Sequence, residues 1–191
     1  MNILICGDSF AADWQLKYPD KKGWPNFLAD KHNVINLAQA GCGEFKILKQ
    51  LQSVTLRDFD KIIIAHSSPF RLYVKNHPVH TDQLHRNCDL IYSDIKEHSK
   101  NNKKLLALVD YFENYFDLDY AIDIHNITCE KIDQITKKFK PIHITGFEWV
   151  GLYQFDNMIN FNYIFKKYKG IINHYSPEGN DEVYGYIQAR L

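Results

Sequence analysis

A serine near the amino terminus and a histidine near the carboxyl terminus are the side chains in this sequence best suited to nucleophilic chemistry. Ser9 directly follows Gly7 and Asp8, and His174 stands two residues before Ser176. A serine hydroxyl is a poor nucleophile until a base removes its proton, and histidine is the base suited to neutral pH. This chemistry requires that the fold bring the two ends of the chain into one pocket.

The residues around Ser9 predict elements that can present its hydroxyl. Residues 3–6, Ile-Leu-Ile-Cys, form an unbroken apolar run, which is typical of a strand buried on both faces of a parallel sheet. Gly7 supplies the backbone freedom for a sharp turn, and Asp8 or Ser9 can cap a helix that starts near Phe10. Ser9 is therefore expected at the carboxyl end of a central strand, where open α/β sheets bind ligands and a helix dipole favours developing negative charge.

The first third of the chain alternates strand and helix patterns. Residues 34–37 predict a second buried strand, a glycine loop around Gly41 follows, and a helix with one apolar face is expected from about Glu44. Residues 61–65 form the third predicted strand. This β-α-β-α-β order predicts a parallel sheet with right-handed crossovers, so Ser9 and Gly41 are expected at the same sheet edge.

The rest of the chain gives less regular signals. The long stretch 66–88 contains two prolines and several histidines and is expected to be a functional loop. Residues 105–109 are apolar nearly all round, which leaves a helix and a strand as alternatives, and the aromatic stretch 147–170 carries no clear period. Three more helices are expected: one from Trp24-Pro25, one that ends before Pro141, and a final one capped by Ser176. A strand is expected at 142–145. The helix before Pro141 carries apolar residues on one side, namely Ile124, Ile127, Ile132, Ile135 and Phe139. Because His174 lies just before that final helix, its loop is expected at the same sheet edge as Ser9.

The composition narrows the class of protein to which the chain can belong. The 191 residues suggest a single domain over 1–191, and 23 basic residues balance 23 acidic ones, so nothing indicates a nucleic-acid partner. Aromatic residues make up 14%, which excludes a disordered chain, and no apolar run reaches the length of a membrane span. The first strand begins without a charged leader and the four cysteines are scattered, so we expect a reduced, cytoplasmic protein without a secretory signal.

Three blocks of the sequence resemble the SGNH or GDSL-type serine hydrolases. The first block stands as Gly7-Asp8-Ser9-Phe10. The second, an asparagine with a glycine five residues later, stands as Asn36-Leu-Ala-Gln-Ala-Gly41. The last, a histidine followed by a turn with proline and glycine, stands as His174-Tyr-Ser-Pro-Glu-Gly179. Each block alone occurs by chance, but their order, spacing and strand contexts agree, and together they span nearly the whole chain.

The resemblance implies a flavodoxin-like, three-layer α/β/α sandwich with a mostly parallel sheet. It also implies that Ser9 is the nucleophile, that His174 is its base, and that the backbone N–H groups of Ser9 and Gly41 form most of the oxyanion hole. The implied activity is hydrolysis of a small acyl ester, such as an acetyl ester on a carbohydrate, with a lipid or a thioester as other substrates. No metal or cofactor is implied, and the expected partner is the ester alone, with no nucleic acid and no insertion into a membrane.

Two positions depart from the family pattern. The third block, normally Gly-x-Asn-Asp, is replaced by Ala65-His66-Ser67-Ser68, so that Ser67 falls where an asparagine usually donates to the oxyanion. A hydroxyl can donate there but reaches less far, and His66 is a second candidate. The aspartate usually found three residues before the histidine is replaced by Ile171, which cannot orient an imidazole, and Asn173 is adjacent but out of step. These departures leave a Ser–His dyad, or a histidine oriented by another group.

The sequence also permits other functions. The same departures are compatible with an SGNH-fold binding module that is weakly active or inactive. A phosphate- or nucleotide-binding protein is disfavoured, because the turn after the first strand lacks the lysine and the glycines of the known phosphate motifs. His77, His80, His85 and Cys88 carry donors suitable for zinc, but their spacing fits no familiar finger and Pro78 stiffens the loop. We therefore expect no metal site.

Overall fold

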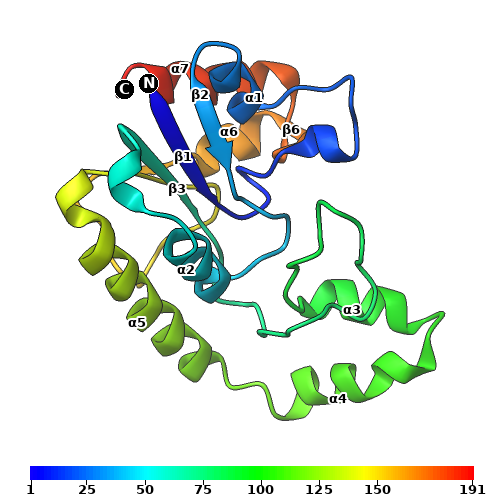
Figure 1. Ribbon diagram of the computed structural model, residues 1–191. Coiled ribbons are helices and arrows are strands. Elements are labelled where there is room, and N and C mark those ends of the chain that lie inside the picture. Colours follow the sequence, from blue (N-terminus) through cyan, green and yellow to red (C-terminus); the bar gives the residue numbers. More distant parts are fainter.

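The computed structural model describes all residues 1–191, and its centre is a parallel five-stranded sheet in the order β2-β1-β3-β4-β5 (Figure 1). The strands are β1 (Asn2–Gly7), β2 (Asn33–Asn36), β3 (Lys61–His66), β4 (Ile142–Thr145) and β5 (Met158–Asn160). This is the strand order of flavodoxin-like folds, in which ligands bind where the order reverses, here between β1 and β3. The expected fold class is confirmed.

Helices cover both faces of this sheet and complete a three-layer sandwich (Figure 1). The side chains of residues 3–6 alternate between the two faces, so β1 contributes to both apolar cores. One face is covered by α1 (Trp24–Ala29), α6 (Asn162–Lys167) and α7 (Pro177–Gln188). The other face is covered by α2 (Glu44–Gln52) and α5 (Leu118–Thr136).

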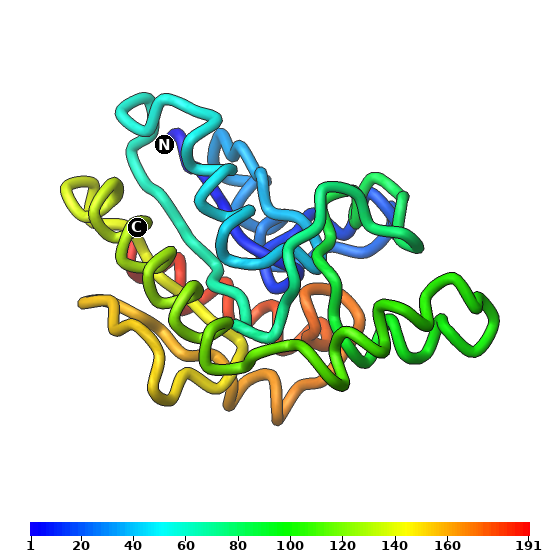
Figure 2. The backbone as a smooth tube through the Cα atoms, turned by 90° about the horizontal axis from the view of Figure 1, so that it is seen from below, coloured from blue at the N-terminus to red at the C-terminus, as the bar shows by residue number.

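The segment between β3 and α5 lies to one side of the sandwich. Its helices α3 (Tyr92–Ser99) and α4 (Leu106–Asn114) pack around an apolar cluster of their own, and Figures 1 and 2 show this green segment extending away from the sheet. The strand alternative for residues 105–109 is therefore wrong, because they belong to helical turns. The smaller elements are the 3₁₀ helices Trp14–Leu16, Leu56–Asp58, Lys103–Leu105 and Lys137–Phe139 and the short strand β6 (Lys169–Ile172).

The expected helix near Phe10 does not form, because side chains from elsewhere occupy the backbone carbonyls that it would need. A helix uses each of these carbonyls to accept an N–H from the next turn. Here the donors are the Asn173 amide to Ser9 and Ala12, the Trp14 indole to Ser9, the Trp24 indole to Phe10 and the Asn36 amide to Ala11. The chain therefore makes turns after Ser9 and coils only briefly at Trp14–Leu16.

Two expectations of burial are also wrong. β2 is not buried on both faces, and Ile35 is 43% exposed, because the strand lies at the edge of the sheet. In α5, Ile124 and Ile127 are exposed, and the face toward the sheet carries His125 and Cys129 beside the expected Ile132. The helix is turned so that His125 Nε2 can donate to the carbonyl of Ser67 at 2.9 Å.

The helix ends follow the signals in the sequence. Pro25 stands in the first turn of α1, and the Ser176 hydroxyl accepts from the Gly179 N–H at the start of α7. After α5, the chain leaves the last 3₁₀ turn through Lys140 at φ 48°, just before Pro141. These three predictions are confirmed. No helix of the chain is both long enough and apolar enough to cross a membrane.

Candidate active site

Ser9 stands at the carboxyl end of β1, in the turn that Gly7 opens. A Cβ on Gly7 would lie 2.6 Å from the Ala65 side chain of β3, so only glycine lets the two strands approach this closely. Asp8 Oδ1 accepts from the Phe10 N–H at 3.0 Å and closes the turn around Ser9. The turn thus fixes a serine that is 7% exposed at the point where the strand order reverses.

His174 reaches Ser9 from a loop near the other end of the chain. Its Nε2 lies 2.7 Å from Ser9 Oγ, which is a hydrogen-bond distance. Asn173 and His174 have φ values of 50° and 66°, a conformation that costs about 1–3 kcal/mol for a residue other than glycine. The Asn173 amide offsets this strain by donating to Ser9 O at 3.2 Å and to Ala12 O at 2.9 Å. The loop is thereby tied to the Ser9 turn, and the two predicted side chains come together.

The imidazole of His174 is oriented by aromatic packing rather than by an acid. No carboxylate contacts its second nitrogen, and Ile171, at the position of the usual aspartate, is 56% exposed. The ring centre lies 4.5 Å from that of Phe10 and 6.2 Å from those of Trp14 and Phe165. The arrangement is a Ser–His dyad held among three aromatic rings.

The environment of His174 keeps its imidazole neutral. Burial, and secondarily the positive charge of Arg71, lower the pKa of His174 from 6.5 to about 4. At pH 7 the ring is uncharged, so Nε2 can accept a proton from Ser9. The same surroundings disfavour the imidazolium that proton transfer creates, and a negative charge near Arg71 would relieve this penalty.

The backbone N–H groups of Ser9 and Gly41 are available to an oxyanion. Neither donates a hydrogen bond within the protein, and both residues line the cleft of about 330 Å³ that also contains His174. Gly41 has a φ of 77°, and a Cβ there would lie 2.2 Å from Cys88 Sγ. Both observations require glycine at this position.

We expect Gly41→Ala to lower both the stability and the activity of the protein. A side chain at this φ is strained by about 1–3 kcal/mol, and the loop that carries the Gly41 N–H must also move away from Cys88. Gly151→Ala is a matched control, because Gly151 has a φ of 72° but no atom within 4 Å of an added Cβ. Urea unfolding and ester hydrolysis of both variants separate strain from contact. Equal losses in the two variants would show that the Cys88 contact has no consequence.

Ser67 and His66, the sequence candidates for a third oxyanion donor, do not line this cleft. Both are fully buried. The Ser67 N–H donates to Glu44 Oε2 at 3.0 Å, and His66 Nδ1 donates to Glu44 Oε1 at 2.6 Å. The hydroxyl of Ser67 has no hydrogen-bond partner. These residues belong to a buried polar network at the end of β3.

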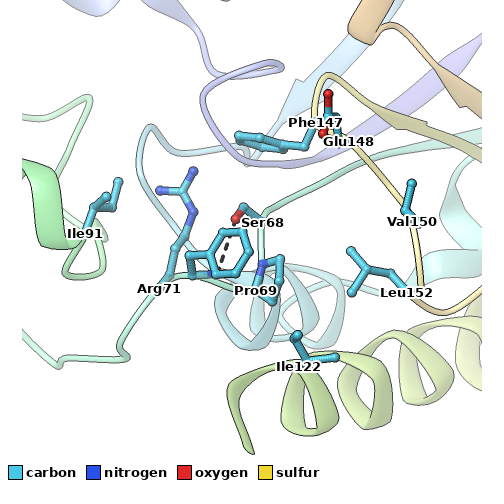
Figure 3. A pocket seen from close by; sticks show the side chains of 10 residues that line it. Ser68, Pro69, Arg71, Ile91, Ile122, Phe147, Glu148, Val150 and Leu152 are labelled. Carbon is cyan, nitrogen blue, oxygen red and sulfur yellow. Dashed lines mark hydrogen bonds between the residues drawn. The ribbon is translucent and has the colours of Figure 1, made fainter. Parts of the chain in front are cut away.

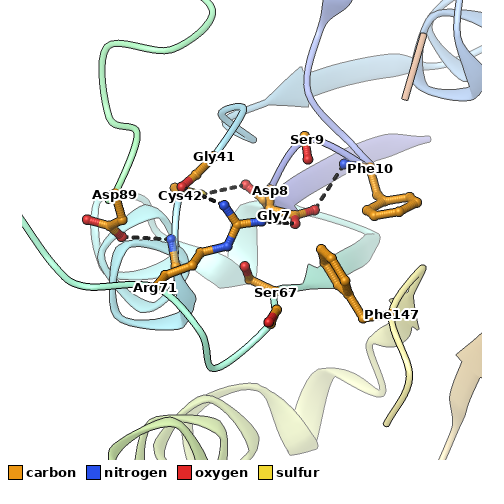
Figure 4. A network of polar contacts seen from close by, with 12 residues as sticks. Gly7, Asp8, Ser9, Phe10, Gly41, Cys42, Ser67, Arg71, Asp89 and Phe147 are labelled. Atoms are coloured by element: carbon orange, nitrogen blue, oxygen red, sulfur yellow. Dashed lines mark hydrogen bonds and ion pairs between the residues drawn. The ribbon is translucent and has the colours of Figure 1, made fainter. Parts of the chain in front are cut away.

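Arg71 lines the cleft, although the sequence analysis did not single it out. Its side chain is 7% exposed. One terminal nitrogen donates to Gly41 O at 2.9 Å, and the other lies 3.4 Å from Asp8 Oδ2 (Figure 4). The guanidinium carbon lies 5.8 Å from the centre of the Phe147 ring. The one signal in the sequence was a charged residue three positions after the block 65–68, where the sequence departs from the family pattern.

Asp8 is an incomplete counter-ion for Arg71. It is fully buried, and burial raises the pKa of Asp8 to about 7, although Arg71 and the Phe10 N–H act in the opposite direction. Burial thus opposes ionisation of the Asp8 carboxyl, and the single contact at 3.4 Å neutralises the Arg71 charge only in part.

An apolar cavity of about 490 Å³ adjoins the Ser9 cleft (Figure 3). Arg71, Ile91 and Phe147 line both spaces. The apolar side chains of the cavity are those of Pro69, Phe70, Ile91, Ile122, Phe147, Val150 and Leu152. Such walls suit an alkyl or acyl chain, and the shared lining connects them to the reacting groups.

The histidines of loop 66–88 gather around carboxylates rather than around Cys88. His80 Nε2 lies 3.0 Å from Asp94, and His85 Nδ1 lies 2.8 Å from Asp82. Cys88 is buried and its thiol donates to a backbone carbonyl. The four residues that the sequence offered for zinc therefore do not converge on one point.

A smaller group, His77, His80 and Asp94, has ligand atoms within 4.8 Å of one another. His77 Nδ1 accepts the N–H groups of Val79 and His80 at 3.1 and 3.0 Å. This pattern puts the ring hydrogen of His77 on Nε2, the nitrogen that faces Asp94 at 3.7 Å. The lone pair that a metal would need is then absent, and Nε2 itself has no hydrogen-bond partner in the protein.

No protein-family model and no curated protein matches the sequence. Among solved structures, the chain is similar to a "putative lipolytic protein of G-D-S-L family" from Desulfitobacterium hafniense DCB-2. The two share 15% sequence identity over 100% of this chain and 99% of that chain, with a TM-score of 0.39. At this distance the likeness says nothing about the residues of the cleft.

Proposed function

We propose that the protein is a serine hydrolase that cleaves a small acyl ester through an acyl-enzyme on Ser9. The observation that carries this proposal is the 2.7 Å separation between Ser9 Oγ and His174 Nε2. The unpaired N–H groups of Ser9 and Gly41 in the same cleft support it. Together these groups supply the nucleophile, the base and the oxyanion donors that acyl transfer needs.

In the first half of the reaction, Ser9 Oγ attacks the ester carbonyl carbon while His174 Nε2 takes the hydroxyl proton. The carbonyl oxygen becomes an oxyanion and accepts hydrogen bonds from the N–H groups of Ser9 and Gly41. The bond to the alcohol then breaks, and the alcohol leaves with the proton from Nε2. Water repeats the sequence against the acyl-Ser9 ester, which releases the acid and restores the hydroxyl.

The surroundings of the dyad support a short or moderately apolar acyl group as substrate. The cavity beside the cleft is lined mainly by apolar side chains, and Phe147 belongs to both spaces. An aromatic wall of this kind also packs well against the face of a sugar ring. An acetyl ester on a carbohydrate is therefore one substrate to test, beside esters of longer acyl chains.

A binding module without activity is the second candidate function. The observation that favours it is the second ring nitrogen of His174, which no carboxylate contacts. Loss of the orienting acid lowers kcat by about 10⁴ in enzymes that depend on it. Here aromatic packing on Phe10 and the tie from Asn173 would have to replace that orientation.

A fluorophosphonate probe separates the two functions. We expect the wild-type protein to be labelled covalently, with the modified peptide mapping to Ser9 by mass spectrometry. The exposed helical residue Ser93 provides a control, because Ser93→Ala should still be labelled. If the folded wild-type protein is not labelled, the hydrolase proposal fails and the binding module is favoured.

The pH dependence of hydrolysis should report on His174. The base must be neutral in the free enzyme, and its pKa is lowered to about 4. We therefore expect kcat/KM to rise as the pH passes through about 4. Ionisation of His174 should cause little further change between pH 5 and 7. Circular dichroism over the same range identifies any loss that is due to unfolding. Because burial also raises the pKa of Asp8 to about 7, an acid limb near pH 6.5 contradicts the environment assigned to His174 if it persists in a folded Asp8→Asn variant.

A further inference from the structure

Arg71 is a buried cation in the wall of the Ser9 cleft. Its side chain is 7% exposed, and it lines the cleft together with Ser9, Gly41 and His174. It also lines the apolar cavity beside the cleft. The guanidinium therefore stands where the part of a substrate next to the scissile bond would lie.

The hydrogen bonds of this guanidinium are incomplete. An arginine head group offers five N–H donors. Within the protein its contacts are the Gly41 carbonyl at 2.9 Å and one Asp8 oxygen at 3.4 Å, one on each terminal nitrogen, and Nε is buried without a partner. Each terminal nitrogen therefore has one N–H left for a ligand. A buried charge that is not fully paired is costly, so a ligand that supplies acceptors here gains binding free energy.

The two carboxylates near Arg71, those of Asp8 and Asp94, do not fully neutralise its charge. Asp8 makes a single long contact instead of the paired contacts of a strong arginine–carboxylate pair, and its Oδ1 is already used by the Phe10 N–H. The other carboxylate of the cleft, Asp94, is held by His80 at 3.0 Å. The cleft wall thus carries an unbalanced positive charge in a chain whose formal net charge is zero.

This charge also affects the dyad. Arg71 disfavours the imidazolium form of His174, which must appear when Ser9 loses its proton. An anionic group bound to Arg71 would cancel that effect during the reaction. A negatively charged substrate would therefore help the base that acts on it.

We propose that Arg71 binds an anionic group of the substrate, a carboxylate or a phosphate, and that the cleft selects esters with this group close to the scissile carbonyl. The inference rests on the proposed function, because it treats the bound molecule as a substrate. The anion site itself does not depend on catalysis. Arg71 is tied to Gly41 through the carbonyl of the residue whose N–H is offered to the oxyanion. The anion must accordingly lie within a few bonds of the reacting carbon.

The kinetic test compares two esters with the same leaving group and the same acyl length, 4-nitrophenyl butyrate and mono-4-nitrophenyl succinate, of which only the second carries a carboxylate. We expect the wild-type protein to prefer the succinate by about tenfold or more in kcat/KM, because a hydrogen bond to a charged group contributes about 1.5–3 kcal/mol. Arg71→Gln should lose this preference, mainly through KM. Arg71→Lys keeps the charge but not the planar fork, and should keep part of it. An equal loss for both esters in Arg71→Gln would overturn the proposal and assign Arg71 to the reacting carbonyl.

Direct binding separates this inference from the proposed function. In the Ser9→Ala background, which cannot form an acyl-enzyme, calorimetric titration with succinate and with inorganic phosphate measures anion binding alone. We expect binding of at least one anion to weaken by about tenfold or more when Arg71→Gln is added. The anion that binds distinguishes a carboxylate from a phosphate. Binding of neither, or equal binding with and without Arg71, overturns the inference whether or not esters are hydrolysed.

Two controls complete the binding test. Arg57→Gln removes the same charge from an exposed 3₁₀ turn just before β3. This turn lies at the amino-terminal edge of the sheet, whereas the cleft lies at the carboxyl-terminal edge. Arg57→Gln should leave anion binding unchanged. Arg71→Lys is titrated in parallel, so that the test still decides if Arg71→Gln fails to fold. A folded lysine variant that binds both anions as tightly as the protein with Arg71 would count against the proposal.

Discussion

Alanine in place of Ser9 is expected to lower kcat/KM for a 4-nitrophenyl ester by about a thousandfold or more. The substitution removes the atom that would attack the carbonyl, and neither Asp8 nor Phe10 offers a replacement nucleophile. The free energy of unfolding should hardly change, because the hydroxyl makes one hydrogen bond, to His174. Release of 4-nitrophenolate and urea unfolding measure the two effects.

The matching experiment removes His174. We expect His174→Ala to reduce kcat/KM to about the same level as Ser9→Ala, and the double variant to be no worse, because groups that act as a unit are not additive. Additive losses in the double variant would mean that the two side chains act separately. Activity of Ser9→Ala within tenfold of wild type would place the chemistry elsewhere in the molecule.

Replacing Glu44 by glutamine is expected to lower the free energy of unfolding by about 1–3 kcal/mol, the effect of leaving a buried hydrogen-bond donor without a partner. Glu44 is 4% exposed at the start of α2, and it accepts hydrogen bonds from His66 Nδ1 and from the Ser67 N–H. His125 lies 3.7 Å away on α5. An amide cannot accept with both of its heavy atoms, so one buried donor would lose its partner.

The ionisation of Glu44 gives this prediction a pH dependence. Burial raises the pKa of Glu44, but His66, His125 and the Ser67 N–H together outweigh burial and leave the pKa below its usual 4.5. The carboxylate therefore contributes stability above about pH 4.5, and this contribution is lost as the pH falls through the lowered pKa. The difference in unfolding free energy between wild type and Glu44→Gln should shrink accordingly at low pH.

Glu97→Gln is the control for Glu44→Gln. Glu97 is a helical glutamate whose side chain is 69% exposed and pairs with Lys100 on the surface, so its loss should change the unfolding free energy by less than about 1 kcal/mol. Urea unfolding at pH 7 measures both variants. A change of less than 1 kcal/mol in Glu44→Gln would show that the buried network contributes little to stability.

Glu44 also explains why the third oxyanion position could not be assigned from the sequence. Counting residues places Ser67 where an asparagine usually stands, and the end of β3 was predicted to within one residue. Whether the side chain at that place faces the cleft depends on Glu44 from α2 and His125 from α5, which hold the backbone of Ser67. Neither contact can be recognised from the residues near Ser67 in the sequence. Arg71, and not Ser67, lines the cleft.

The sequence by itself determined four of the five strands of the central sheet, β1 to β4, the parallel pairing of the first three and the cap of the last helix. It did not determine β5, which lies in the stretch 147–170 that carries no clear period. It also predicted that Ser9, Gly41 and His174 lie at one edge of the sheet. Unbroken apolar runs, glycines and prolines depend on contacts within a few residues and predict the elements. The topology of these elements then determines which loops meet. Only the tertiary structure decided that the carbonyls after Ser9 bind distant side chains instead of forming a helix. It likewise decided that Asn173 ties the histidine loop and that a buried guanidinium stands in the cleft. These features depend on partners far apart in the chain, and the free energy of burying a polar group is set by those partners and not by its neighbours in sequence.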